Sequence, residues 1–444
     1  MPRFLGICFL AAALFSFSSC EKPAPVDPEQ GETPDLTEAS IKLLIDKSKL
    51  TLGSEEGATL NVIFSCDHDW KIVVAEGAEW LTFSKTEGTA GKMISTKAVA
   101  AKNDDRKREA ACQIVSGVSV LDFVIKQDQA SLVLTAADVE DLDRYYQPKE
   151  FNFDMMNSSS KWSFCRSKQS EHFIVFWDIK YGEYGLYGEK MGVENTSPST
   201  LPSSNRMYVD IDDLLMKAEQ FFDTNINKLK MAELGVGKSY LDDYKMEIYI
   251  LYQSEWLATG SGYDNVIGAL WVNPATCKPV GSTIAHEIGH SFQYQTYCDK
   301  VYQGEPDNLA YGFRYGFGPK GEGGCAYWEQ CAQWQSFQDY PHQQFGGDLN
   351  VFKAQYNRHF HHEWMRYASY WLQSYWVEKR GVEAYGEIWR QSVLPEDAIK
   401  TYTKIYNGGD WSKTAAELYD YAARMATFDI DGVREYAGSN VTAN

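Results

Sequence analysis

The sequence predicts a multidomain chain in which an all-β, Ig-like sandwich precedes a larger α+β domain with a mainly helical C-terminal half. Two observations predict this order. Short alternating apolar segments, separated by Gly, Asp and Asn, recur over residues 41–130, as is typical of sandwich strands. Over residues 131–444, runs typical of buried strands give way to apolar residues at helical spacing.

Composition excludes some classes of partner. The chain of 444 residues has 42 Lys and Arg against 61 Asp and Glu, a net charge of −19. A nucleic-acid-binding protein needs a basic surface to displace counterions, so we expect no nucleic-acid partner. The same balance argues against attachment to anionic lipid through a basic patch. With 44% hydrophobic residues, the chain can build large cores.

The N-terminus has the features of an export signal. Residues 4–17 are almost wholly apolar or small, but this run is shorter than the roughly 20 residues that span a bilayer. The run ends in Phe17-Ser18-Ser19-Cys20, which resembles a bacterial lipoprotein signal. That resemblance implies removal of residues 1–19, a lipid on Cys20 and an exported lipoprotein at the outer membrane or cell surface. An ordinary secretory signal with an incidental cysteine, and a periplasmic location, remain alternatives.

Residues 20–40 and 41–130 are expected to form a tether and a sandwich. The first range is acidic and rich in Pro, which favours an extended chain that holds the rest of the protein off the membrane. We expect the membrane contact to be the lipid anchor alone. The second range contains seven candidate strands: IKLLID, TLNVIF, WKIVVA, EWLTFS, KMISTKAV, ACQIV and VLDFVIKQ.

Within the predicted sandwich, five features resemble the BACON domain of exported Bacteroidetes proteins. The resemblance implies a β-sandwich that binds glycans or acts as a spacer. Trp70 and Trp80 would be binding residues in the first case and core residues in the second. The features are Trp70, Ala78-Glu79-Trp80-Leu81, Glu87-Gly88-Thr89, the turn from Asn103 to Arg106, and Val124-Ile125-Lys126-Gln127.

Seven cysteines remain once Cys8 leaves with the signal and Cys20 carries the lipid. An odd number leaves at least one free thiol in a monomer. Cys66 with Cys112, and Cys325 with Cys331, are possible disulfides, and buried free thiols are the alternative.

The first half of the large domain mixes strand and helix patterns. Residues 173–177 and 246–251 indicate buried strands, and residues 211–229 carry apolar residues at helical spacing. Residues 266–272 indicate a further strand. This strand lies just before the helix with the HExxH motif described below, an arrangement that resembles zincin folds. The resemblance implies that the strand forms the sheet edge that pairs with an extended substrate.

The strongest motif is the HExxH sequence from His286 to His290. Residues four apart share one helix face, so both imidazoles are available to one ion, and neutral imidazole is a preferred zinc ligand. Glu287, beside the ligands, can take a proton from a water that the metal activates. Gly289 costs about 1 kcal/mol relative to Ala inside a helix, which suggests that another element packs closely there.

The surrounding residues predict that this motif lies on a helix over residues 282–297. We expect Ser282 to cap its N-terminus. Its apolar face has helical spacing at Ile284, Ile288 and Phe292.

A catalytic zinc ion requires a third protein ligand and one open position. A metzincin site would need Gly and His where this chain has Gln293 and Thr296, so that class is excluded. The best candidate ligand is Glu329, on a predicted helix over residues 327–340. Apolar residues at 327, 328, 331, 334 and 337 give that helix a buried face. The alternatives are Glu305, Asp307 and Glu322, in a loop rich in Gly, or no third carboxylate.

The motifs HEIGHSFQ and WEQCAQW, together with residues 170–177, resemble a group of secreted, gluzincin-like metallopeptidases. The resemblance covers roughly residues 150–395 and implies a zincin-like fold with Zn²⁺ held by His286, His290 and Glu329. The segment from His359 to Trp376 resembles the helix behind gluzincin sites, where a Tyr or His stabilises the oxyanion. We expect Tyr367 in this role, with His359, His361 and His362 as alternatives.

Two functions from different classes follow. The first is an exported, membrane-tethered zinc metallopeptidase that hydrolyses peptide bonds in extracellular protein or glycoprotein substrates. The HExGHxxQ pattern also resembles enhancin-like peptidases, which implies a mucin-type glycoprotein substrate. The second is a surface glycan- or glycoprotein-binding lipoprotein whose zincin domain is catalytically degenerate.

Overall fold

The computed structural model describes residues 38–103, 107–181, 197–305, 324–346, 349–393 and 396–438 of the chain. The predicted signal over residues 1–19, the lipidation residue Cys20 and most of the tether lie outside these ranges. Within them, no helix combines the length and the apolarity needed to cross a membrane. The chain divides into two compact units. Of the described residues, 38–102 and 107–128 belong to the first unit, and Asn103 and the residues from Gln129 onwards belong to the second.

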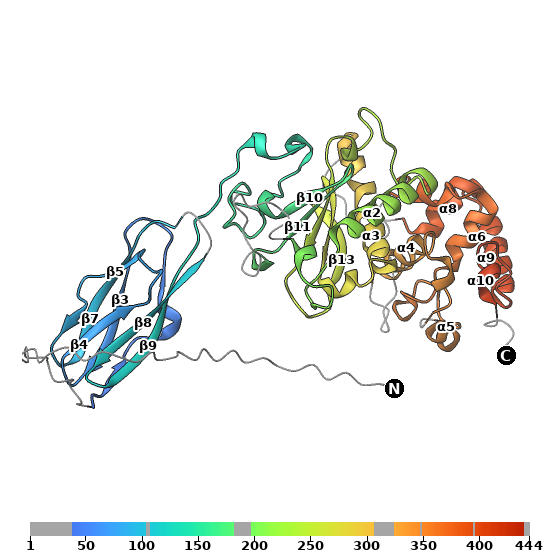
Figure 1. Cartoon of the computed structure of the whole chain (residues 1–444). Coiled ribbons are helices and arrows are strands. Elements are labelled where there is room, and N and C mark those ends of the chain that lie inside the picture. Colours follow the sequence, from blue (N-terminus) through green and yellow to red (C-terminus); the bar gives the residue numbers. More distant parts are fainter. Residues whose placement is uncertain are drawn as a thin grey trace, which may run out of the picture. The chain divides into compact units, whose positions relative to one another are not determined.

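The first unit is built from two antiparallel-rich sheets of short strands (Figure 1). One sheet has the order β1-β3-β7-β5 and the other has the order β2-β9-β8-β4-β6. All seven predicted strand segments are confirmed, because each overlaps one of these strands. The strands are β1 (Ile41–Leu43), β2 (Thr51–Leu52), β3 (Ala58–Cys66), β4 (Trp70–Val74), β5 (Leu81–Phe83), β6 (Glu87–Gly88), β7 (Gly91–Ala100), β8 (Arg108–Ser116) and β9 (Ser119–Gln127).

The two tryptophans of interest in the first unit are not equally exposed. Trp70 is buried and packs edge-on against Phe64, with ring centroids 5.0 Å apart. The guanidinium of Arg108 lies over the ring of Trp80, 4.6 Å from its centroid. Trp70 is therefore a core residue of the sandwich, and Trp80 is covered on one face by a cation.

The second unit contains a five-stranded mixed sheet in the order β10-β11-β12-β14-β13. Strands β11, β12 and β14 are parallel, whereas β10 and β13 pair antiparallel at the two edges. The predicted strands over 173–177, 246–251 and 266–272 are confirmed. The strands are β10 (Ser167–Gln169), β11 (Phe173–Trp177), β12 (Met246–Ile250), β13 (Ala258–Tyr263) and β14 (Ile267–Val272).

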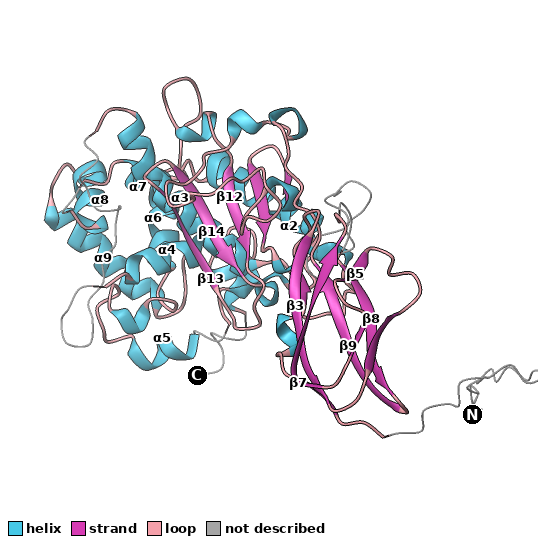
Figure 2. Cartoon of the chain, turned by 90° about the vertical axis from the view of Figure 1, so that its left-hand side faces the viewer, coloured by secondary structure: helices cyan, strands magenta, loops and turns pink. Residues whose placement is uncertain are grey.

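Helices make up most of the C-terminal half of this unit (Figure 2). Helix α2 (Ile211–Asp223) and helix α3 (Ser282–Tyr302) both contact the sheet. Figure 1 shows the later helices on the side of α3 away from the sheet. They are α4 (Ala326–Ser336), α5 (Leu349–Gln355), α6 (Trp371–Arg380), α7 (Ala384–Arg390), α8 (Ala398–Asn407), α9 (Trp411–Met425) and α10 (Arg434–Ala437).

The prediction that residues 266–272 form the sheet edge is wrong. This segment, β14, lies between β12 and β13, and both of its sides are hydrogen-bonded. The chain makes a hairpin before the site helix, so the edge position falls to β13.

The expected helix over residues 359–376 is also wrong in its first half. Residues 359–370 contain only a short 3-10 turn, Glu363–Met365, and α6 begins at Trp371. The His362 side chain accepts a hydrogen bond from the backbone N–H of Trp364, and Glu363 turns away to the N-terminus of α4, where it accepts from the N–H of Ala326. Both side chains accept hydrogen bonds from backbone N–H groups. Such bonds compete with the hydrogen bonds of a helix, so this segment forms a turn.

The seven cysteines beyond residue 20 are all free thiols, and six of them are buried. Cys66 lies on β3 and Cys112 on β8, in different sheets. Cys325 and Cys331 are six residues apart at the start of α4, so their side chains leave the helix in different directions. Neither possible disulfide forms.

Candidate metal centre

Helix α3, which carries the HExxH motif, lies directly on the hairpin of β13 and β14. Three hairpin glycines allow this contact. A Cβ on Gly260 would lie 2.0 Å from the carbonyl oxygen of Glu287, and one on Gly262 would lie 2.3 Å from the ring of Tyr294. Gly268 is similarly close to the backbone of Ser291. The edge strand therefore runs against the turn of α3 that carries Glu287.

The start of α3 differs from the sequence prediction. The N-cap residue is Gly281, and no side chain caps the helix. Ser282 is the first helical residue, so the predicted Ser282 cap is wrong. The backbone of Gly281 has φ −165° and ψ −143°, and the chain enters the helix one residue earlier than the pattern indicated.

Helix α4 packs against the opposite side of α3 at Gly289. A Cβ there would meet Gln335 at 3.2 Å and the Cα of Ala332 at 3.4 Å. The prediction that another element packs closely at Gly289 is confirmed. This close approach brings Glu329, in the first turn of α4, over the two histidines of α3.

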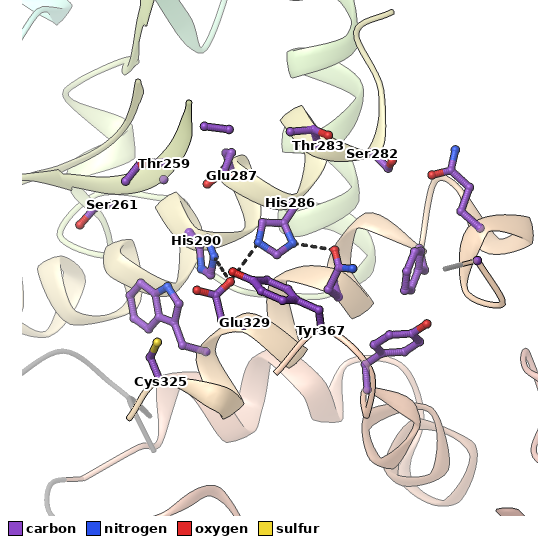
Figure 3. Close-up of a pocket in the computed structure, with 18 of the residues that line it drawn as sticks. Thr259, Ser261, Ser282, Thr283, His286, Glu287, His290, Cys325, Glu329 and Tyr367 are labelled. Atoms are coloured by element: carbon purple, nitrogen blue, oxygen red, sulfur yellow. Dashed lines mark hydrogen bonds and ion pairs between the residues drawn. The ribbon is translucent and has the colours of Figure 1, made fainter. Parts of the chain in front are cut away.

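His286, His290 and Glu329 converge on one point (Figure 3). The Nε2 atoms of His286 and His290 lie 3.2 Å and 3.1 Å from the same carboxylate oxygen of Glu329. Both histidines are buried, and Glu329 is partly buried. The structure thus brings together the three residues that the sequence predicted as ligands, from two different helices.

The far nitrogen of each imidazole is also engaged. Nδ1 of His286 lies 2.8 Å from Oε1 of Gln333, one turn beyond Glu329 on α4. Nδ1 of His290 lies 3.0 Å from Oε1 of Gln293. An amide oxygen accepts only, so Nδ1 of each imidazole carries a proton, and Nε2 is the nitrogen left for Glu329 or for an ion.

The proximity of the three residues shifts the pKa values of Glu329 and His286. Burial favours the neutral form of Glu329, but hydrogen bonds with His286 and His290 outweigh it and hold the pKa of that carboxyl well below its usual range. Burial likewise disfavours protonation of His286, yet the hydrogen bond with Glu329 and the nearby charge of Glu287 raise the pKa of that imidazole. Glu329 is therefore an ionised carboxylate at neutral pH.

This donor set fits a zinc ion. Bonds of about 2.0–2.1 Å in tetrahedral geometry place ligand atoms about 3.3 Å apart, close to the 3.1 Å and 3.2 Å between the histidine nitrogens and Glu329. Two imidazoles and one carboxylate leave a fourth position for a water or a substrate, as in catalytic sites. Hydrogen bonds to the Nδ1 atoms orient the ligands in the manner usual for metal-binding histidines.

The three residues line an open cavity of about 760 Å³. Glu287 lines the same cavity and is buried. The edge strand contributes Thr259, Gly260 and Ser261 on one side, with Trp256 just before it. A bound chain could therefore extend along β13 while passing over the two histidines and Glu287.

Tyr367 reaches the cavity from the opposite side. Its ring centroid lies 6.1 Å from that of His286, and Figure 3 shows the side chain extending towards Glu329. Burial and the charge of Glu329 raise the pKa of Tyr367 to about 12. The hydroxyl therefore stays protonated and can donate a hydrogen bond at neutral pH.

The alternatives that lie among the described residues do not line the cavity. The three histidines proposed as alternatives to Tyr367 lie elsewhere, and His361 is buried against Tyr327. Glu305, an alternative third ligand, is exposed beyond the end of α3. Asp307 and Glu322 lie outside the described residues.

Comparison with known families matches residues 137–443, more than half of the chain, to a "Family of unknown function (DUF6055)". The chain belongs to this family. The DUF6055 region contains the HExxH helix, Glu329 and Tyr367. No curated protein matches the chain.

Solved structures resemble the chain only weakly. A xyloglucanase of Bacteroides ovatus is 12% identical over 58% of this chain, with a TM-score of 0.19, and the chain spans 44% of its length. A protein of Bacteroides thetaiotaomicron is 15% identical over 23% of this chain and 97% of its own, with a TM-score of 0.15. A C. elegans member of the MSP family is 9% identical over 21% of this chain and 97% of its own, also at 0.15. These TM-scores carry no argument about fold or function.

Sequence reasoning missed several residues of this candidate site. Gln293 and Gln333 contact the imidazoles, and Trp328 stacks on His290 with ring centroids 5.3 Å apart. Gln333 could have been found, because it lies four residues after Glu329 on one helix face. The glycine-rich strand β13 has no alternating apolar pattern that would mark it as part of the site.

Proposed function

We propose that this protein is an exported zinc metallopeptidase that hydrolyses peptide bonds in protein or glycoprotein substrates. The observation that carries the proposal is the convergence of two histidine nitrogens and one carboxylate oxygen on an open cavity that Glu287 also lines. The donor set favours a zincin-like interpretation of the domain, with His286, His290 and Glu329 as the ligands. When bound there, zinc supplies Lewis acidity, which lowers the pKa of a water and polarises a carbonyl.

The other cavity residues have distinct roles in this proposal. Glu287 takes the proton of the attacking water and delivers it to the leaving amine nitrogen. Tyr367 donates a hydrogen bond to the oxygen of the tetrahedral intermediate. Strand β13 pairs with the extended substrate through its free backbone edge.

In this proposal, the N-terminal part of the chain attaches the protein to the membrane and holds the second unit away from it. A lipid on Cys20 anchors the protein, the acidic tether extends it, and the first unit acts as a BACON-like spacer. The buried ring of Trp70 favours a spacer over a glycan-binding module that would use this residue. Replacement of Cys20 with Ser should release the protein from the membrane fraction of cells that export it.

The test begins with zinc content per chain, measured by mass spectrometry on the wild type and on Glu329→Ala. We expect about one zinc in the wild type and much less in the variant. Gln330→Ala is the matched control, because the neighbouring residue on α4 does not line the cavity, and it should retain zinc. No zinc in the wild type, even after zinc is offered, would end the enzyme interpretation and favour the glycan-binding alternative.

Activity is then measured as new amino termini released from protein substrates, with and without EDTA. Glu287→Ala should keep zinc and lose hydrolysis, because it removes the proton acceptor and leaves the ligands in place. Hydrolysis at the wild-type rate by this variant would show that the mechanism is wrong.

A further inference from the structure

Behind His290, on the side away from Glu329, three buried amide side chains continue its hydrogen bonding into the helical core. Gln293 Oε1 lies 3.0 Å from Nδ1 of His290. Gln293 Nε2 donates to Oε1 of Gln335 at 2.8 Å, and Gln335 Nε2 donates to Oδ1 of Asn225 at 2.6 Å. Asn225 Nδ2 donates to the backbone oxygen of Phe221 at 2.8 Å. We call Gln293, Gln335 and Asn225 the amide relay.

The relay can point in only one direction. The carbonyl of Phe221 accepts and cannot donate, so the NH₂ group of Asn225 must face it, and Asn225 Oδ1 must accept from Gln335. Gln335 Oε1 must then accept from Gln293, and it also accepts from the hydroxyl of Tyr385 at 3.1 Å. Gln293 is left with its oxygen towards His290, and a second bond from its Nε2 to the carbonyl of Trp328, at 3.2 Å, fixes the same orientation.

The last member of the relay lies in an unusual backbone segment. Asn225 belongs to the π-helix Thr224–Lys228, which follows directly on α2. π-helical turns are rare and occur frequently at functional sites. The side chain of Asn225 is buried, as are those of Gln293 and Gln335. Burying three amides at one place lowers stability unless every donor and acceptor is paired, and here the pairing runs to a metal-ligand candidate.

We propose that the amide relay is a positioning device for the metal ligand His290, an inference that rests on the proposed function. It holds a proton on Nδ1, which leaves Nε2 as the nitrogen for the metal, and it fixes the rotation of the ring. Zinc then binds without reorganising this ligand. His286 differs, since its Nδ1 partner is Gln333, which lines the cavity. Gln293, Gln335 and Asn225 are positioning residues and touch no substrate.

The test measures zinc affinity by competition with a chelator. Removal of partners of this kind typically weakens metal binding about 10- to 100-fold. We expect Gln293→Met to weaken zinc binding by close to 100-fold. Gln335→Met should weaken it by close to 10-fold, because Gln335 acts on His290 only through Gln293. Asn225→Leu removes the final donor and acceptor and serves as a second variant should Gln335→Met not fold.

Gln330→Met is the matched control for lost stability. Gln330 is a buried glutamine on the same helix, and its Nε2 donates to the carbonyls of Phe360 and Met365. Its replacement should lower thermal stability to a similar degree and leave zinc affinity unchanged. The double variant Gln335→Met/Asn225→Leu should weaken zinc binding no more than the stronger single variant, since both interrupt one relay. Equal zinc affinity in the wild type and Gln335→Met, or additive losses in the double variant, would overturn the proposal.

A second readout needs no metal. The protein for this test is zinc-free and carries Glu329→Ala, because the carboxylate of Glu329 lies 3.1 Å from Nε2 of His290 and would compete for the proton. With ¹⁵N-histidine labelling, nitrogen–proton correlation spectra distinguish the two neutral tautomers, and the signals of His290 are assigned by their loss in His290→Gln. We expect the Nδ1–H tautomer alone in this background and a mixture of tautomers when Gln335→Met is added. The same mixture without Gln335→Met would refute the relay. A single tautomer in this background, together with a wild type that binds no zinc, would refute the proposed function alone.

Discussion

The core of the β-sandwich and the interface between α3 and α4 bury polar side chains in different ways. Among the described residues of the first unit, the buried polar side chains are Thr96, Ser116 and Gln127. All three bond to backbone carbonyls: Thr96 to Lys85, Ser116 to Asp69, and Gln127 to Gly53 and Ala101. None of these three side chains is ionisable.

The α3–α4 interface buries ionisable and amide groups that bond to one another. His286, Glu287 and His290 are buried there, next to the amides of Gln293 and Gln335. Burial of such groups lowers stability unless they are paired. In the sandwich the buried polar side chains bond to the backbone, whereas at this interface they lie around a cavity. The place where a protein buries polar groups in excess of what its fold needs is a candidate site of function.

Of the variants that test this comparison, Tyr367→Phe has the largest expected effect, because it removes one polar group from the cavity and leaves the three candidate ligands in place. Tyr367→Phe keeps the ring beside His286 and removes only the hydroxyl. We expect zinc content to be unchanged and kcat/KM to fall about 100-fold, a loss typical of a missing hydrogen bond to the oxyanion. The measurement is the rate of peptide hydrolysis together with zinc per chain.

Tyr370→Phe is the control for this variant. Tyr370 also lines the cavity, but its hydroxyl donates to the carbonyl of Gln344. Loss of that bond should lower stability by about 1 kcal/mol and leave turnover nearly unchanged. If both variants reduced turnover equally, Tyr367 would have no special role as a donor.

Much of the candidate metal site could be predicted from the sequence because its signals are local. His286 and His290 are four residues apart on one helix face, and Glu329 lies on a segment with its own helical apolar pattern. The sandwich strands were predictable for a similar reason, since one face of each is buried and the apolar residues alternate.

The remaining features depend on contacts between distant segments. Strand β13 could not be predicted, because its glycines are required by the backbone of α3 and give no apolar alternation. The amide relay joins Asn225, Gln293 and Gln335, whose proximity follows from the packing of three helical elements and from no sequence spacing. The prediction that Ser282 caps the helix was wrong by one residue, because a sequence pattern locates a helix boundary only to within a residue or two.

A buried acid at the far end of α3 sharpens the comparison, because it is polar and buried but lies outside the cavity. Asp299 accepts hydrogen bonds from Ser239 and Gln295, both at 2.7 Å. Burial raises the pKa of Asp299 from 3.8 to about 7. The folded state therefore keeps a proton that the unfolded chain loses above about pH 4, and this contribution to stability is lost as pH rises towards 7.

Asp299→Asn should flatten this part of the pH dependence. The amide oxygen of Asn can accept both hydrogen bonds, and no proton is lost on unfolding. We expect the free energy of unfolding at pH 7 to rise by on the order of 2 kcal/mol, with little change at pH 4. Thermal or denaturant unfolding at several pH values measures this. An unchanged pH slope would show that Asp299 is already ionised in the folded protein, and zinc affinity should not change in either case.

The smallest effect is expected in the sandwich core, where the comparison predicts a change in stability without a change in function. Ile114 on β8 is fully buried, and Ile114→Val removes one methylene. The loss should be about 1 kcal/mol, which lowers the unfolding temperature of a unit of this size by roughly 4–8 °C. Val124→Ala on β9 is the control, because Val124 is 41% exposed and its truncation should cost about 0.5 kcal/mol or less.

Zinc affinity and kcat/KM should match the wild type in both variants, since no polar group at the α3–α4 interface is altered. A fall in kcat/KM that follows the stability of Ile114→Val would mean that the sandwich supports the cavity directly, and the distinction between a core for folding and an interface for function would fail.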